Sequence, residues 1–323
     1  MTKRIYISRN WPPAALERAA ALGSLTVNHT DVAPTPETWL EILTQYDVVC
    51  PTVTDQLDGP LLDAAAAQGL RCGLLANFGV GFNHIDIDAA HRHGVLVSNT
   101  PGVLTQATAE IALTLMLMSA RRTAEGERLV RQGAWQGWTP THMLSMGLDG
   151  RTLGIFGMGR IGIALARKAH FGLGMRVLYA SRSPLDAATA EALQAERVEL
   201  DELLTRSDVV SLNCPATPET RHIINARALS LMQPHAHLIN TARGDVVDEV
   251  ALVAALRQGQ IAGAGLDVYE SEPALAPGLV ELENVTLLPH MGSGTLSTRE
   301  AMGARALDNV EAWLTDQPLP DQV

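Results

Sequence analysis

The chain has few cysteines, no cluster of basic residues and no long apolar run, and each absence excludes a class of protein. Cys50, Cys72 and Cys214 are isolated and lack metal-ligand spacing, so the sequence predicts buried, reduced thiols and no metal site. A formal net charge of −11 argues against a nucleic-acid partner. The most apolar segment, 111–118, is far shorter than the ~20 residues that span a bilayer, so no membrane partner is expected.

The length and the first residues of the chain set further bounds. A chain of 323 residues, 46% of them hydrophobic, is long enough for two globular domains. Its first segment passes directly into a strand-like run at 4–8, without the apolar region of a signal peptide. We therefore expect a cytoplasmic protein.

A single glycine-rich fingerprint lies near the middle of the chain. An apolar run at 152–156 precedes it, and a segment of helical composition follows it. Gly157 permits a tight turn, Gly159 lets the backbone approach phosphates, and Gly162 allows close packing of helix on strand. The N-terminus of the helix then faces the negative charge of a pyrophosphate. The sequence thus predicts a dinucleotide site that includes Gly157, Gly159, Arg160, Ile161 and Gly162.

Apolar runs alternate with helical segments, which is typical of α/β proteins with parallel sheets. The long segment 107–122 predicts a connecting helix, and the last helical pattern, 296–314, has no strand left to serve beside the fingerprint. It is expected to return to the first part of the chain. Six strands are predicted after residue 150, at 152–157, 176–181, 208–214, 236–243, 263–269 and 285–290.

These elements predict two domains separated by a cleft. Residues 101–290 would form a doubly wound, Rossmann-type cofactor domain. Residues 1–100 and 291–323 would form a smaller, flavodoxin-like α/β domain that binds the substrate and is built from both termini.

Five ordered motifs, at 99–104, 154–162, 240–244, 265–273 and 289–293, resemble those of the D-2-hydroxyacid dehydrogenase family. They span roughly residues 70 to 300. A series of ordered motifs is far more specific to a family than one glycine turn. The resemblance implies that the catalytic trio is Arg243, Glu272 and His290. It also implies nicotinamide-side contacts at Thr241, Ala242, Asp267 and the stretch from His290 to Ser293, which includes Gly292. Cys214 and Pro215 are further predicted to bind the cofactor.

The chemistry of a 2-oxo acid reduction explains these residue types. Hydride transfer to the carbonyl carbon requires a proton at the oxygen, and His290 is a donor that titrates near neutral pH. A carboxylate such as Glu272 would favour its protonated form. Arg243 suits a carboxylate and stabilises developing charge. Glu270 has the same chemistry as Glu272, and only the motif register selects between them.

The segment 77–82 is glycine-rich and follows a predicted strand. The backbone N–H groups around Val80 and Gly81 are predicted to hold the substrate carboxylate opposite Arg243. Phe78 and Gly79 are predicted to bind the substrate as well. The alternative is that the segment is only a loop at the end of a strand.

The end of the second strand of the cofactor domain indicates which dinucleotide binds. NAD-specific folds place an acidic residue there, about 20 residues after the fingerprint. This chain has Ser181, Arg182 and Ser183 instead. A hydroxyl and a guanidinium fit a 2′-phosphate, so we predict NADP(H). The alternative is that Arg182 only stacks on adenine and that both cofactors bind.

Within the family, the chain most resembles the NADPH-dependent glyoxylate/hydroxypyruvate reductase branch. This resemblance implies a homodimer that reduces glyoxylate and hydroxypyruvate. Segment 137–142 would lie near the dimer interface, although His142 departs from the aromatic residue expected there. A reductase of a bulkier 2-oxo acid and a dinucleotide-sensing, corepressor-like binding protein are the alternatives.

Overall fold

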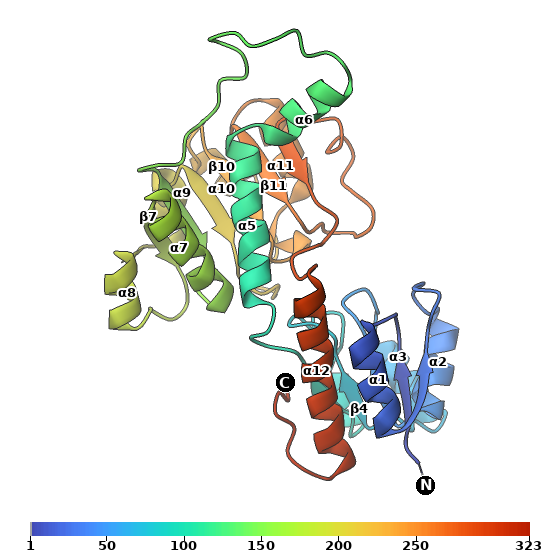
Figure 1. Ribbon diagram of the computed structural model, residues 1–323. Coiled ribbons are helices and arrows are strands. Elements are labelled where there is room, and N and C mark those ends of the chain that lie inside the picture. The colour runs from blue at the N-terminus through green and yellow to red at the C-terminus, as the bar shows by residue number, and fades with distance from the viewer. Residues whose placement is uncertain (1) are drawn as a thin grey trace. The chain divides into compact units, whose positions relative to one another are not determined.

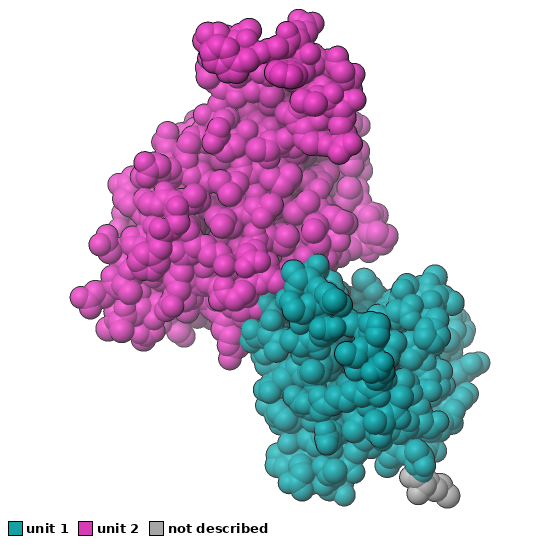
Figure 2. Space-filling view, in the orientation of Figure 1, with its two compact units in different colours: residues 1–104, 293–323 teal, residues 105–292 magenta. Residues whose placement is uncertain are grey.

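The computed structural model describes residues 2–323, which group into two compact units (Figure 2). Unit 1 comprises residues 1–104 and 293–323, and unit 2 comprises residues 105–292. Each unit is built on one parallel sheet. None of the helices within residues 2–323 is long and apolar enough to cross a membrane.

Unit 1 contains a five-stranded sheet in the order β2-β1-β3-β4-β5, which is the flavodoxin-like order. Successive residues of β1 face opposite sides: Ile5 packs with α1 and α12, whereas Tyr6 packs with α2 and α3. The inner strands β1, β3 and β4 are largely buried on both faces, as a parallel sheet requires, whereas the edge strand β2 is partly exposed. The strands are β1 (Arg4–Ile7), β2 (Ser24–Val27), β3 (Val48–Cys50), β4 (Leu74–Ala76) and β5 (Leu96–Ser98), and the helices are α1 (Pro13–Leu22), α2 (Pro36–Gln45), α3 (Gly59–Ala67), α4 (Ile87–Arg92) and α12 (Leu296–Leu314).

The last helix, α12, returns to the first part of the chain, as the sequence predicted. It packs beside α1 (Figure 1) and buries Met302, Leu307 and Val310 against the sheet. The two helices approach so closely that a Cβ on Gly303 would lie 2.6 Å from the Cβ of Ala15. The fold class predicted for the smaller domain, an α/β unit built from both termini, is therefore confirmed.

Unit 2 contains a seven-stranded parallel sheet in the order β12-β11-β10-β9-β6-β7-β8. Counted along this unit, the order of the first six strands is that of a Rossmann fold. The prediction of six strands was wrong by one, because β8 is only two exposed residues long and carries no apolar pattern. The strands are β6 (Thr152–Phe156), β7 (Arg176–Ala180), β8 (Glu196–Arg197), β9 (Val209–Leu212), β10 (His237–Asn240), β11 (Gly263–Leu266) and β12 (Val285–Leu287).

Helices cover both faces of this sheet (Figure 1). The helices α5 and α7 pack on one face, and α9, α10 and α11 pack on the other. The strands between them are almost entirely buried, which explains their unbroken apolar sequences. The helices are α5 (Thr105–Ala120), α6 (Thr123–Arg131), α7 (Arg160–Leu173), α8 (Ala187–Leu193), α9 (Leu200–Arg206), α10 (Ala226–Leu231) and α11 (Glu249–Arg257), and a 3₁₀ turn covers Gly244–Val246.

Candidate active site

The glycine turn between β6 and α7 has the geometry that a pyrophosphate needs. Gly157 has φ +95°, and a Cβ there would lie 2.6 Å from the backbone nitrogen of Cys214. A Cβ on Gly162 would lie 2.6 Å from the carbonyl oxygen of Gly157, so the helix packs tightly on the strand. Gly159, by contrast, faces open space and begins α7 without a capping side chain from the described residues. The first N–H groups of α7, which carries Arg160 and Ile161, are thus left for an anion.

A basic loop follows β7, at Ser181, Arg182 and Ser183. Arg197 of β8 donates to the backbone carbonyls of Ser181 and Arg182, at 2.9 and 3.1 Å, and so holds this loop. Glu219 lies near enough for the charge of Arg182 to contribute to its lowered pKa, although the hydrogen bond with Thr217 contributes more. The loop therefore carries a positive charge at a backbone fixed by a second arginine.

The turn after β10 is shaped by Asn240, a motif residue to which the sequence alone assigned no role. Its side chain accepts from the N–H of Ala242 at 3.0 Å and donates to the carbonyl of Arg243 at 2.9 Å. Between them, Thr241 has a buried hydroxyl with no hydrogen-bond partner among residues 2–323. A buried hydroxyl without a partner is costly, so this position fits a polar group of a ligand. The buried thiol of Cys214, which precedes Pro215, lies two residues after the end of β9.

His290 and Glu272 form a dyad in which Nδ1 of the imidazole lies 2.7 Å from Oε2 of the carboxylate. The second oxygen, Oε1, accepts from the backbone N–H of Tyr269 at 2.9 Å. Burial alone raises the pKa of Glu272, but the hydrogen bond and charge of His290, the Tyr269 N–H and the charge of Arg243 together lower it. Glu272 is thus an ionised carboxylate beside a half-exposed imidazole.

The carboxylate of Asp267 holds the backbone next to the dyad. Its Oδ1 accepts from the N–H of Met291 at 2.7 Å, and a Cβ on Gly292 would lie 3.2 Å from Oδ2. Burial raises the pKa of Asp267, and the bonds from this backbone and the charge of His290 oppose the rise. Asp267 therefore positions the segment that carries His290, which has φ +52°.

The structure separates the two glutamates that the sequence left in competition. Glu270 accepts from Arg221 and lies 2.8 Å from Nε2 of His222. It faces these side chains, whereas Glu272 contacts His290. The motif register and the geometry therefore select the same residue.

Arg243 lies at the end of β10 and is half-buried. Its Nη1 donates to the carbonyl of Ala242 at 2.7 Å. Burial lowers the pKa of the guanidinium, and the charges of Glu272 and Asp245 oppose this effect. The charges of Arg243 and of Glu272, in the dyad, therefore act on each other.

In unit 1, the loop after β4 is held by the side-chain amides of two residues, Asn77 and Asn99, whose role the sequence did not predict. Asn77 donates to the carbonyls of Gly79 and Gly81, at 3.1 and 3.0 Å, and Asn99 donates to the carbonyl of Val80 at 2.8 Å. Within residues 2–323, the backbone N–H groups of Val80 and Gly81 make no hydrogen bond. Phe78, which begins this loop, is buried.

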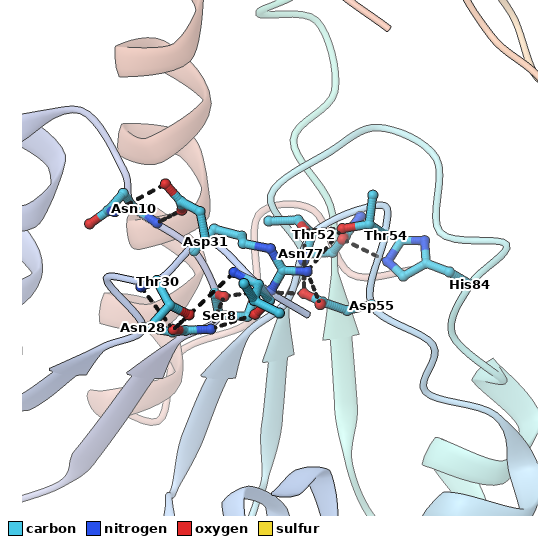
Figure 3. A network of polar contacts seen from close by, with 12 residues as sticks. Ser8, Asn10, Asn28, Thr30, Asp31, Thr52, Thr54, Asp55, Asn77 and His84 are labelled. Atoms are coloured by element: carbon cyan, nitrogen blue, oxygen red, sulfur yellow. Dashed lines mark hydrogen bonds and ion pairs between the residues drawn. The ribbon is translucent and has the colours of Figure 1, made fainter. Parts of the chain in front are cut away.

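Figure 3 shows a wider polar network at this edge of unit 1. Asp55 is fully buried and accepts from the Ser8 hydroxyl at 2.5 Å and from the Thr52 N–H at 2.8 Å, and it pairs with Arg9 at 2.9 Å. His84 Nε2 lies 3.1 Å from the Asn77 amide oxygen. Ser293, predicted as a cofactor contact, also lies in unit 1.

A Rossmann sheet with a glycine turn, an arginine and a histidine–glutamate dyad at its carboxyl edge defines an oxidoreductase that uses a dinucleotide. The family described as D-isomer specific 2-hydroxyacid dehydrogenase, NAD binding domain, matches residues 113–292. The chain belongs to this family, and the family resemblance predicted from the sequence is confirmed.

Relatives and solved structures agree over the full length. A glyoxylate reductase of Thermococcus litoralis is 42% identical over 100% of this chain and 97% of its own. A glyoxylate reductase structure from Paecilomyes thermophila has 33% identity and a TM-score of 0.87, covering 100% and 98% of the two chains. An NADPH-dependent glyoxylate/hydroxypyruvate reductase from Sinorhizobium meliloti, in complex with NADP and malonate, has 34% identity and a TM-score of 0.85, covering 100% and 97%.

Proposed function

We propose that this protein reduces a small 2-oxo acid, glyoxylate or hydroxypyruvate, to the D-2-hydroxy acid with NADPH. The contact between His290 and Glu272 carries the proposal, because it supplies an oriented proton donor at the carboxyl edge of a dinucleotide fold. The reduced nicotinamide ring, when bound, supplies the hydride. The names of the similar reductases support this substrate class.

His290 would donate its proton from Nε2 to the carbonyl oxygen of the substrate. Glu272 engages Nδ1, so the imidazole is held in one orientation with Nε2 available. No described residue forms a hydrogen bond with Nε2 of His290. Burial raises the pKa of Glu272, but the hydrogen bond and charge of His290 help to lower it overall, so an ionised carboxylate orients the ring for proton transfer to the carbonyl oxygen.

Two groups of residues, Arg243 in unit 2 and the loop after β4 in unit 1, are each suited to a carboxylate. The planar guanidinium fits a carboxylate and polarises the neighbouring carbonyl. The N–H groups of Val80 and Gly81 have no acceptor among the described residues, while Asn77 and Asn99 hold the neighbouring carbonyls. These N–H groups are therefore oriented donors for the substrate carboxylate. We infer on this basis that unit 1 binds the substrate, including Phe78 and Gly79, and that unit 2 binds the dinucleotide.

The preference for NADPH would come from the loop after β7. Ser181 and Arg182 stand where an acid would repel a 2′-phosphate, and Arg197 fixes the backbone of the loop. The remaining contacts proposed for the dinucleotide are the glycine turn, Ser183, Cys214, Pro215, Thr241, Ala242, Asp267, Gly292 and Ser293.

The exposed residues of segment 121–147 lead us to include a homodimer in the proposal. Trp135 and Trp138 are 53% and 79% exposed, and Leu144 is 68% exposed. Exposed large apolar side chains are typical of protein interfaces, so the second subunit would cover these three residues. His142 lies in the same segment. Localisation in the cytoplasm is also part of the proposal, and fractionation of cells that express the protein would test it.

Steady-state turnover across a panel of 2-oxo acids, with NADPH and with NADH, tests the proposal. We expect the highest kcat/KM with glyoxylate or hydroxypyruvate and NADPH. A maximum with a phenylpyruvate-like or sugar-derived acid would favour the bulkier-substrate alternative. Dinucleotide binding without turnover of any 2-oxo acid would favour the corepressor-like alternative and would contradict the proposal.

A further inference from the structure

A buried carboxylate outside the catalytic trio contacts the turn that carries Glu272. Glu249, the first residue of α11, is 5% exposed, and its Oε1 accepts from the backbone N–H of Glu270 at 2.8 Å. Glu249 therefore holds the turn at Glu270, two residues before Glu272.

The same turn is pressed against the residue that follows Arg243. A Cβ on Gly244 would lie 1.8 Å from the carbonyl carbon of Tyr269 and 2.1 Å from the nitrogen of Glu270, so only glycine fits. The peptide between Tyr269 and Glu270 is thus held by Gly244 on one side and bonded to Glu249. The N–H of Tyr269, at the start of this turn, donates to Glu272.

We propose that Glu249 is a positioning residue, whose carboxylate fixes the turn 269–276 and thereby holds Glu272 against His290. This inference rests on the proposed function, because it assigns Glu249 a part in orienting the proton donor. Removal of the carboxylate would leave the backbone N–H of Glu270 without its acceptor, and the turn would have to move to satisfy it.

Several charged groups surround the dyad and must be considered together. Arg243 and Asp267 act on Glu272 and His290, and Glu270 and Glu272 both interact with Glu249. Burial raises the pKa of Glu249, as do these two carboxylates, while the N–H groups of Glu270 and Ala276 oppose the rise. The test therefore separates the hydrogen bond of Glu249 from its charge.

Three variants separate the two contributions. Glu249→Gln keeps an oxygen acceptor for the Glu270 N–H but removes the charge. Glu249→Asp keeps the charge but shortens the reach, and Glu249→Ala removes both. If position is what matters, we expect kcat to fall about tenfold in the Ala and Asp variants and to stay within about threefold of wild type in the Gln variant. KM for NADPH should not change in any of the three.

The matched control is Asp248→Ala, which removes the N-cap of the same helix. Asp248 Oδ1 accepts from the Ala251 N–H at 2.9 Å and, among residues 2–323, makes no side-chain hydrogen bond with the turn. This control should retain wild-type kcat. A second control uses Glu272→Gln as background: if Glu249 acts only through Glu272, Glu249→Ala should cause no further loss of kcat there.

NMR of the His290 imidazole gives a readout that does not require turnover. At a fixed neutral pH, the protonated fraction of His290 should fall in Glu249→Ala and in Glu249→Asp, and stay near wild type in Asp248→Ala. Absence of 2-oxo acid reduction by the wild type would refute the proposed function but leave this arm informative. Wild-type kcat and protonation in the Ala or Asp variant, an equal loss in Asp248→Ala, or an additive loss in the Glu272→Gln background would overturn the inference.

Discussion

In each of the two parallel sheets, an aspartate at the amino ends of the strands links neighbouring strands by the same kind of hydrogen bond. In unit 1, Asp47 precedes β3 and accepts from the N–H of Arg4, in β1, at 2.8 Å. In unit 2, Asp208 precedes β9 and accepts from the N–H of Thr152, in β6, at 2.8 Å. Both aspartates are buried. Asp47 also pairs with Arg71, and Asp208 pairs with an arginine of unit 2.

At the carboxyl ends, the two sheets differ. In unit 1 the ionised groups neutralise each other, as Asp55 does with Arg9, and their bonds fix loops (Figure 3). In unit 2 this edge holds an open glycine, a buried hydroxyl without a partner among the described residues, and the dyad. The same architecture thus uses its amino edge for stability, while the carboxyl edge of unit 2 presents groups suited to ligands.

The largest effect is expected at the two histidines of these carboxyl edges. His290→Ala should lower kcat by roughly 10²- to 10⁴-fold, because it removes the proton donor. His84→Ala, in unit 1, removes a contact with Asn77 and should raise KM for the 2-oxo acid while kcat stays within severalfold. Steady-state kinetics of both variants checks this contrast. Wild-type turnover by the His290 variant would show that another group supplies the proton.

The arginines at the two carboxyl edges, Arg243 in unit 2 and Arg9 in unit 1, should also differ: loss of the first should impair catalysis, and loss of the second should reduce stability. Arg243→Ala should raise KM for the 2-oxo acid and lower kcat, each by roughly ten- to a hundredfold, since the residue is proposed to bind both substrate and transition state. Arg9→Ala leaves the buried Asp55 without its cation and should instead lower the free energy of unfolding by about 3 kcal/mol. Kinetics and denaturant unfolding separate the two. A purely structural defect in Arg243→Ala would contradict the assignment.

The cofactor loop gives a narrower test of the carboxyl edge of unit 2. Arg182→Ala should reduce the preference for NADPH over NADH by roughly ten- to a hundredfold, through KM for the cofactor. Arg197→Ala should reduce it less, because Arg197 acts through the loop backbone. The ratio of kcat/KM values for the two cofactors is the measurement. Equal use of NADH and NADPH by the wild type would refute the cofactor proposal.

The amino edges should behave alike. Burial raises the pKa of Asp208 and of Asp47, but the backbone N–H bonds and nearby cations outweigh it, so both pKa values are lowered. Stability from these groups is therefore present above the ordinary carboxyl pKa and is lost as pH falls below about 4, through the lowered values. Asp208→Asn and Asp47→Asn should each cost about 1–3 kcal/mol at neutral pH. Denaturant unfolding between pH 2 and 7 should show weaker acid dependence in both variants, and an unchanged profile would contradict the shared role.

The sequence predicted the elements that carry strong patterns and missed those held by tertiary contacts. Buried strands such as β6 and the helix α12 have apolar patterns, so their positions were predictable. The edge strand β8 has two exposed residues and no such pattern. In the site, motif residues such as His290 were identified, whereas Asn240 and Glu249 act on backbone groups that only the folded chain brings to them.

The central claim is that Glu272, and not Glu270, holds the proton donor, and the pH dependence of kcat/KM for glyoxylate reduction tests it most directly. Glu272 is ionised and contacts Nδ1 of His290, so removal of its charge in Glu272→Gln should make kcat/KM decline at a lower pH than in wild type. Activity at acidic pH should be partly kept. Glu270→Gln is the matched control, since Glu270 contacts Arg221 and His222. The account predicts an altered profile in the first variant and a wild-type profile in the second. An altered profile in Glu270→Gln with none in Glu272→Gln would contradict it.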